Sequence, residues 1–289
     1  MTLYRLHHAT TYDYAEPVVT GTHFMHLLPR GRPGQVVREA HLVISPSPDT
    51  RRDEIDHFGN HTTSISLAGT HKQFSVNLSA TVDASLPAPP AAWDTPRWEA
   101  IAAWGLRDAE VAEFCLPSKL AMPASEIADY AAVSFLPGRS ILDAVQELNR
   151  RIFTEMNYKP GVTNTFTTAQ EILRIRAGVC QDYAHLMLAC LRALGLPGRY
   201  ISGYLRTVPP PGQAKRRGAD QSHAWVSAWA GAEIGWVDFD PTNNLLVHDE
   251  HVTLAWGRDF EDVSPLRGII LGGGRHSLHV GVDLEPVLT

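Results

Sequence analysis

The chain has 289 residues, of which 44% are hydrophobic and 19% are charged, and its formal net charge is -6. This composition is typical of a globular protein with one large or two modest domains, and an acidic chain has no general attraction for nucleic acid or anionic membranes. No run of about 18 apolar residues is present to span a membrane, and the first residues lack the apolar core of a secretion signal. The three cysteines form no disulfide framework, so we expect a reducing, cytoplasmic location.

The first 84 residues predict an antiparallel, sandwich-like β module. Five segments rich in β-branched and aromatic residues are separated by Pro, Gly and Asp clusters; they begin at Leu3, Val18, Val36, His61 and Phe74. In the last of them apolar and polar residues alternate, which is typical of a strand with one buried face.

Residues 85–157 read as a linker followed by helices. The proline-rich stretch Leu86–Pro96 predicts an extended linker. Beyond it the apolar period becomes helical, with Ser125 as an expected N-cap and a second helix over Ser140–Met156.

Residues 158–289 predict an α+β core that includes the last strand of the chain. A short helix is expected to begin at Thr167 or Thr168 and to close at Gly178, and the next helix to run from Cys180 to a C′ residue at Gly195. Strands follow. We interpret the basic loop Thr207–Asp220 as a solvated loop rather than a lid over a substrate.

Cys180 is the first candidate for chemistry. At the start of a helix it meets unpaired backbone N–H groups and the positive end of the helix dipole, which favour a thiolate over a thiol and can hold an oxyanion. Cys190 lies among leucines three turns later and is expected to be an inert core residue, as is Cys115. Ten helical residues separate Cys180 from Cys190 by roughly 15 Å, too far for a disulfide.

A thiolate needs a histidine partner, and position selects His223. On the strand around it, His223 and Trp225 share a face, and on the next strand Asp238 and Asp240 share a face. A two-residue turn beginning at Gly231 would place His223 directly opposite Asp240, within reach of a hydrogen bond. A longer turn would shift the register by two residues and bring Asp238 or Thr242 opposite His223 instead.

The segments "GVCQDYAHLMLACLRALGLPGRYISGYL", "HAWVSAW" and "GWVDFDPTNN" resemble the core of the transglutaminase-like superfamily, in the form of bacterial transglutaminase-like cysteine proteases. The β module, with "YRLHHATTYDY" and "LLPR", resembles the N-terminal region that accompanies this core in bacteria. The resemblance implies a papain-like α+β fold and a triad on Cys180, His223 and Asp240. Its relatives either hydrolyse amides or transfer a glutamine acyl group to an amine, and some have lost catalysis.

We therefore expect a thiol enzyme that acts on peptide or isopeptide amide bonds of a peptide or protein substrate, with hydrolysis preferred to amine transfer. The alternatives are a transglutaminase and a non-catalytic peptide-binding scaffold. Tyr158, Gln181, Trp225 and Asp238 are further candidates for shaping the acyl or oxyanion pocket.

Three other patterns have simpler interpretations. Asp182 is expected to interact with the helix dipole or to cap the helix. His185, about 140° around the helix from Cys180, is expected to pack or hydrogen-bond locally. Arg258 and Asp259 are expected, by resemblance alone, to form an ion pair near the site. No calcium loop and no zinc motif is present, although His248 and His251 flank two acids, so we expect neither a metal nor another cofactor.

Overall fold

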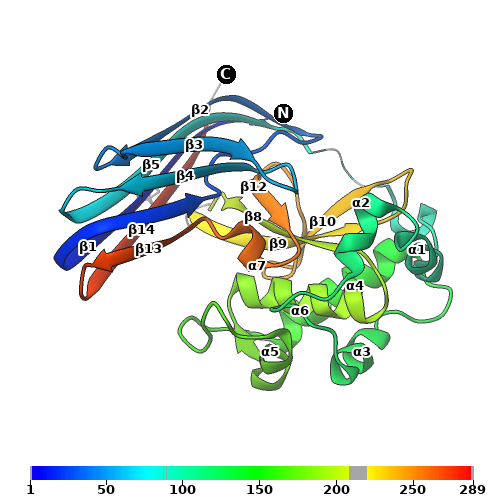
Figure 1. The fold of residues 1–289 in the computed structure, drawn as a ribbon. Helices are drawn as coiled ribbons and strands as arrows, with labels where there is room; N and C mark the ends of the chain where they lie inside the picture. Colours follow the sequence, from blue (N-terminus) through cyan, green and yellow to red (C-terminus); the bar gives the residue numbers. More distant parts are fainter. Residues whose placement is uncertain (1, 87, 89, 208–219, 288–289) are drawn as a thin grey trace, which may run out of the picture.

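The computed structural model describes residues 2–86, 88, 90–207 and 220–287. Two large antiparallel sheets, a small two-stranded parallel sheet and a group of helices make up this part of the chain, which confirms the predicted α+β class (Figure 1). None of the described helices has the length and apolar character needed to cross a membrane.

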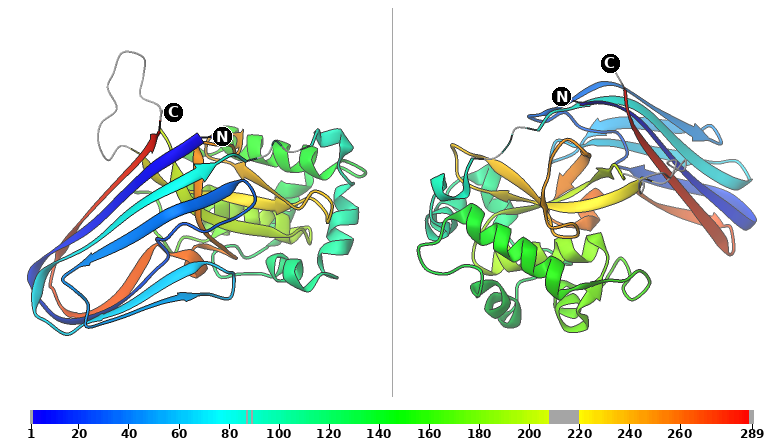
Figure 2. Two further views of the ribbon diagram at one scale, coloured as in Figure 1. Left: turned by 90° about the horizontal axis from the view of Figure 1, so that it is seen from above. Right: turned by 180° about the vertical axis from the view of Figure 1, so that it is seen from behind.

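The N-terminal region is a single sheet that curves into a half-barrel, not a sandwich of two facing sheets (Figure 2). The first two predicted segments continue as one strand, because the chain bends at a register shift between Asp13 and Val18 without leaving the sheet. The strands in the order β2-β5-β1-β4-β3 are β1 (Thr2–Met25), β2 (Gln35–Ser45), β3 (Thr50–Ile55), β4 (His61–Leu67) and β5 (His71–Ala84). The short charged strand β3 carries no hydrophobic pattern and was not predicted.

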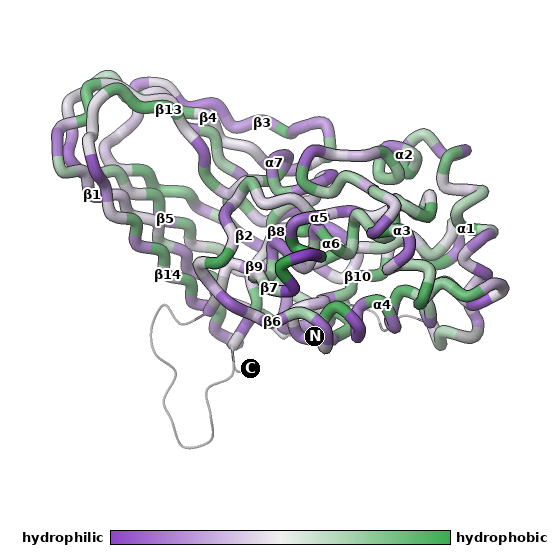
Figure 3. Tube along the Cα trace, turned by 90° about the horizontal axis from the view of Figure 1, so that it is seen from below, coloured by the Kyte–Doolittle hydropathy of each residue, from purple (hydrophilic) through white to green (hydrophobic). Residues whose placement is uncertain are grey.

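The end of the chain completes this sheet. β13 (Leu266–Gly272) and β14 (His276–Pro286) both pair antiparallel with β1. The predicted division at residue 158, which assigned the last strand to the core, is therefore wrong for these strands. The physical reason is burial: Val282 and Leu284 pack into the hydrophobic core beside the N-terminal strands. Hydrophobic and hydrophilic residues alternate along β5 and β14, as expected for strands with one buried face (Figure 3).

Helices and short turns connect the two sheets. They are η1 (Ala92–Asp94), α1 (Trp98–Gly105), α2 (Ala109–Ala112), η2 (Glu113–Cys115), α3 (Ser125–Ala132) and α4 (Ile141–Glu155). Ser125 is the first residue of α3 rather than its cap, and the capping position belongs to Ala124, which makes no side-chain hydrogen bond. The predicted helix after Ser140 is confirmed as α4, with Ser140 at its N-cap.

The second sheet has the order β11-β10-β9-β8-β12 and carries α6 on one face. Its elements are β8 (Gly198–Leu205), β9 (Gln221–Trp229), β10 (Trp236–Asp240), β11 (Leu245–Leu246) and β12 (His251–Gly257), followed by α7 (Phe260–Val263). Gly198 lies against Leu188 and Leu191 of α6, so close that a Cβ there would be 2.8 Å from the Leu188 side chain. Residues 198, 200 and 202 of β8 therefore face the helix, and residues 199 and 201 face away from it.

The segment before α6 contains β6 (Asn157–Tyr158), α5 (Ala169–Ile175) and β7 (Ala177–Gly178). Thr168 caps α5 in a capping box with Glu171, one of the two predicted caps. The helix ends earlier than expected, because Arg176 rather than Gly178 adopts the left-handed conformation, with φ 56°. α6 (Cys180–Ala193) begins at Cys180 as predicted, and Gly195 follows it with φ 72° as the expected C′ residue.

Candidate active site

The first turn of α6 holds Cys180 half-buried, neither sealed in the core nor fully exposed. Asp182 turns back to accept hydrogen bonds from the N–H of Val179 at 2.7 Å and from the Thr163 hydroxyl at 2.6 Å. This is the capping role expected of Asp182. It also explains Gly178, because a Cβ at that position would lie 2.5 Å from the Asp182 carboxylate.

The structure brings His223 and Asp240 together, but not in the predicted register. β9 and β10 pair with Trp229 opposite Trp236 and Val226 opposite Phe239, two residues away from the expected alignment. The turn is longer than two residues, since Ala230 donates to the carbonyl of Gly235 and Gly235 to that of Gly231. His223 and Asp240 are consequently diagonal neighbours across the hairpin, and His223 Nε2 lies 2.8 Å from Asp240 Oδ2.

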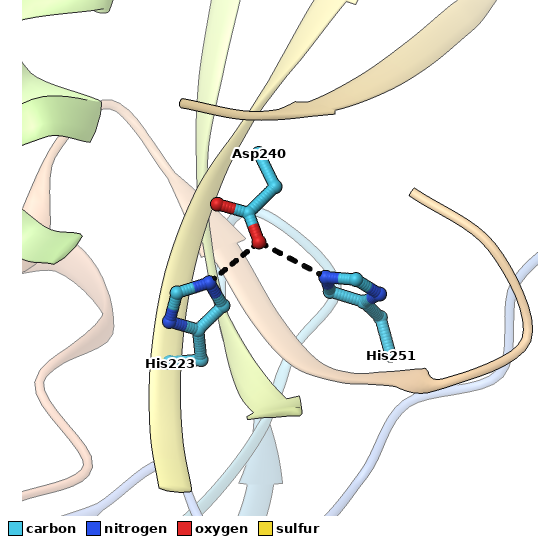
Figure 4. Close-up of side chains that lie close together, drawn as sticks. All are labelled: His223, Asp240 and His251. Atoms are coloured by element: carbon cyan, nitrogen blue, oxygen red, sulfur yellow. Dashed lines mark hydrogen bonds and ion pairs between the residues drawn. The ribbon is translucent and has the colours of Figure 1, made fainter. Parts of the chain in front are cut away.

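Asp240 is completely buried and accepts five hydrogen bonds. Oδ2 accepts from His223 and from His251 Nε2 at 3.3 Å (Figure 4). It also accepts from Asn243 Nδ2 at 2.7 Å. Oδ1 accepts from the backbone N–H groups of Thr242 and Asn243 at 2.9 and 3.2 Å. Burial raises the pKa of this carboxyl, but the hydrogen bonds outweigh burial and hold the pKa far below its ordinary value. Asp240 is therefore a fixed negative charge.

His223 joins this carboxylate to Cys180. Burial lowers the pKa of His223, yet its hydrogen bond to Asp240 and its interactions with Asp240 and the nearby Cys180 raise the pKa to about 10. Because Nε2 faces Asp240, the other ring nitrogen is left for the sulfur. At neutral pH the imidazole is charged, and an imidazolium beside a thiol stabilises the thiolate.

The other two cysteines differ from Cys180 in the expected way. Cys190 and Cys115 are buried and unpaired. Burial raises the pKa of the Cys190 thiol strongly and that of Cys115 to about 11. Only Cys180 thus combines partial exposure with a charged partner among the three.

Comparisons with known proteins now place the chain. Residues 4–83 match the bacterial transglutaminase-like N-terminal region, and residues 132–241 match the transglutaminase-like superfamily. An uncharacterized protein of Mycobacterium tuberculosis is 37% identical over 290 residues, an alignment that covers 98% of this chain and 92% of the relative. A protein of Mycobacterium leprae is 30% identical over 282 residues, with 97% of each chain covered. The chain belongs to the transglutaminase-like superfamily.

Two further similarities extend this assignment. A crystal structure from Cytophaga hutchinsonii, described as a "putative cysteine protease", has the same fold, with a TM-score of 0.77, 23% identity, and coverage of 100% of this chain and 91% of that one. A Pseudomonas aeruginosa protein named protein-glutamine gamma-glutamyltransferase is 32% identical over 107 residues, which are 37% of this chain and 16% of the relative.

Two other candidates lie beside Cys180 of this transglutaminase-like protein. β6 pairs with β7, so Tyr158 is adjacent to Gly178, and its side chain is 52% exposed. Burial and then the nearby Cys180 and Asp182 raise the pKa of the Tyr158 hydroxyl. Gln181 donates from Nε2 to the carbonyl of Thr165 at 3.4 Å. Both residues lie next to Cys180 in the fold without being part of the His223–Asp240 pair.

Trp225 and Asp238 have a different setting. Trp225 is buried, and its indole N–H donates to Asp238 Oδ2 at 3.2 Å. The same carboxylate oxygen receives Arg32 Nη1 at 2.5 Å. These two residues connect the sheet to the N-terminal module and do not hydrogen-bond to Cys180 or Asp240.

Sequence reasoning missed Asn243 and underrated His251. Asn243 stands three residues after Asp240 in "DPTNN", where an Asx-type turn is a recognisable local signal. His251 was considered only with His248 and the acids between them, but it faces His223 and Asp240. Among the described residues, the ligand atoms of these three lie within 4.8 Å of one another, so this trio could hold a metal ion. Without a metal, both histidines hydrogen-bond to Asp240, whereas His251 Nδ1 is buried and has no partner among the described residues.

The remaining predictions had mixed outcomes. His185 is buried and accepts from the N–H of Phe260, the local role expected. The expected pair of Arg258 with Asp259 is wrong: Arg258 pairs with Asp262 at 2.9 Å, because Asp259 caps α7 instead. Residues 208–219 of the basic loop lie outside the described residues.

Proposed function

We propose that this chain is a thiol-dependent acyl-transfer enzyme that hydrolyses peptide or isopeptide amide bonds in a peptide or protein substrate. The observation that carries the proposal is the position of one imidazole: His223 hydrogen-bonds to the buried carboxylate of Asp240 and lies close enough to the Cys180 side chain to interact with it electrostatically. The half-buried setting of Cys180 leaves the thiol within reach of a substrate.

Each residue then has a defined role in the reaction. The Cys180 thiolate attacks the amide carbon, and the N–H groups of the first turn of α6 stabilise the oxyanion. As the C–N bond breaks, the His223 imidazolium gives its proton to the departing amine and leaves an acyl-enzyme. Water then attacks the thioester while His223 takes up a proton, and cleavage of the C–S bond restores the thiolate–imidazolium pair. Asp240 orients the ring and stabilises its charged form throughout.

Amine transfer is the second candidate. It shares the acyl-enzyme and differs only in whether an amine or water reaches it. The similarity of 107 residues to a protein-glutamine gamma-glutamyltransferase supports this alternative. A glutamine peptide offered with a labelled primary amine separates the two: ammonia release with unlabelled glutamate product supports hydrolysis, and label incorporation without net hydrolysis supports transfer.

The test of the chemistry is mass spectrometry of the intact protein after brief incubation with a peptide library and acid quench. We expect a covalent acyl adduct on Cys180 in the wild type, none in Cys180→Ala, and an undiminished adduct in the matched control Cys190→Ala. Iodoacetamide should also label Cys180 rapidly and Cys190 slowly at neutral pH. Equal, slow labelling of both cysteines and no adduct would favour a non-catalytic peptide-binding scaffold.

We also propose a reducing, cytoplasmic setting for this enzyme. Its three cysteines are free, and a thiol nucleophile needs to remain reduced. Fractionation of producing cells, followed by detection of the protein in each compartment, tests this proposal.

A further inference from the structure

A cavity lies on the face of the second sheet that points away from α6. Its volume is about 350 Å³, within the range of small-molecule sites. The linker contributes Leu86, the loop after β1 contributes Arg32, and the sheet contributes Arg199 and Asp238. The cavity therefore lies where the N-terminal module, the linker and the sheet meet, a common place for ligand sites.

Arg199 is the unusual group in this cavity. Its guanidinium carbon lies 3.8 Å from the ring centroid of Trp236 and 4.6 Å from that of Trp256, so aromatic rings hold it in place. Within the part of the chain that the structure describes, its Nε is buried without a hydrogen-bond acceptor. Burial lowers the pKa of Arg199 to about 9, which still leaves the group charged at neutral pH. A held cation without an acceptor is costly unless a ligand supplies one.

Asp238 provides the complementary feature. Its Oδ2 is occupied by Arg32 and Trp225, whereas Oδ1 is buried and has no donor among the described residues. Two arginines and one carboxylate leave one positive charge in the cavity wall. An anion would neutralise that charge, and an N–H group on the same ligand would satisfy Oδ1.

The rest of the wall is mostly apolar, with Ser227 as a polar exception. Ile201, Leu246 and Val247 line the cavity beside these polar groups. A ligand that fits all three features has a carboxylate, an N–H close to it, and an aliphatic side chain. This is the chemistry of an N-acylated amino acid and equally of the C-terminal residue of a peptide.

We propose that this cavity is a binding site for a terminal carboxylate that carries a neighbouring amide N–H and an aliphatic side chain. The carboxylate pairs with Arg199, the N–H donates to Asp238, and the side chain contacts the apolar wall. The site is separate from Cys180, so it stands or falls independently of the proposed chemistry.

Isothermal titration of the full chain with N-acetyl-leucine tests the proposal. We expect saturable binding in the wild type and equal affinity in Cys180→Ala, because the nucleophile does not take part. A peptide ending in leucine, compared with its C-terminal amide, separates the two sources of the ligand: binding of the free acid but not the amide identifies a peptide C-terminus, and binding of N-acetyl-leucine alone identifies a small molecule.

Variants locate the binding. Arg199→Met should weaken binding of N-acetyl-leucine at least tenfold, and Arg199→Lys, which keeps the charge but not the planar fork, should weaken it less. Asp238→Asn should weaken N-acetyl-leucine but not 4-methylpentanoate, which has the same carbon frame without the N–H. Thermal unfolding of each variant shows that it is folded, and Arg199→Lys remains informative if Arg199→Met is not.

Three results would overturn the proposal. They are no saturable binding at millimolar concentrations, affinity unchanged in both Arg199 variants, or binding that disappears in Cys180→Ala, which would assign the ligand to the active site.

Discussion

Replacing Asp240 by asparagine is the sharpest test of the triad. The carboxylate accepts three hydrogen bonds at Oδ2 and two at Oδ1. A carboxamide has only one oxygen, so its NH2 group must replace either Oδ2, which faces three donors, or Oδ1, which faces two. With the oxygen turned to the three-donor side, two backbone N–H groups lose their acceptor, and the charge that balances His223 disappears. At about 1–3 kcal/mol for each unsatisfied group, we expect a loss of about 3–5 kcal/mol in the free energy of unfolding.

The same substitution should slow the chemistry. Burial lowers the pKa of His223, and without the Asp240 charge only Cys180 would still raise it. The pKa of His223 therefore falls, and a smaller fraction of the imidazole is charged at neutral pH. We expect alkylation of Cys180 by iodoacetamide at pH 7 to slow by up to about 30-fold, because only about 3% of an ordinary cysteine is thiolate at that pH. Mass spectrometry measures the rate at Cys180 with Cys190 as an internal reference. Asp262→Asn, which breaks an ion pair elsewhere, is the matched control and should leave the rate unchanged.

The pH dependence gives the refutation. Asp240 has a lowered pKa, so its contribution to stability is present above about pH 4 and is lost as the pH falls below that. His223 has a raised pKa, so its contribution is full below pH 6.5 and is lost as the pH rises toward 10. Urea unfolding of wild type and Asp240→Asn should therefore differ most between about pH 4 and 6.5. A difference that grows from pH 6.5 to 9.5, or labelling at the wild-type rate, would refute the reasoning.

Three other predictions follow from single contacts. Gly178→Ala places a Cβ 2.5 Å from Asp182, so the Asp182 cap must move. We expect the free energy of unfolding to fall by about 1–2 kcal/mol and alkylation of Cys180 to slow, and an unchanged alkylation rate would contradict this. Asn243→Ala removes a 2.7 Å hydrogen bond to Asp240 and should lower the free energy of unfolding by about 1.5–3 kcal/mol. It should also slow acyl-adduct formation at least fivefold, and wild-type values in both assays would show that Asn243 does not position Asp240. Burial lowers the pKa of His8 to about 4, so the free energy of unfolding should fall by up to about 3 kcal/mol as the pH falls from 6.5 to 4. His8→Gln should flatten this pH dependence in urea unfolding, and a curve parallel to the wild type would show that other groups cause it.

The local features of the site were readable from the sequence. The start of α6 at Cys180 and its end before Gly195 depend on a few adjacent residues, whose backbone preferences and apolar period are local properties. His223 and Asp240 could be chosen for the same reason, since both are titratable side chains in short strands of mainly apolar residues. The strand β3, which has no hydrophobic pattern, shows where local signals fail.

Tertiary structure decided the pairing of distant segments. The longer turn between Gly231 and Gly235 shifted the hairpin by two residues, yet a long imidazole side chain still reaches Asp240 diagonally. The placement of β14 against β1, and of His251 beside the Asp240 carboxylate, depends on which surfaces bury one another. Such contacts are set by the free energy of packing the whole chain, and neither spacing nor periodicity within one segment contains it.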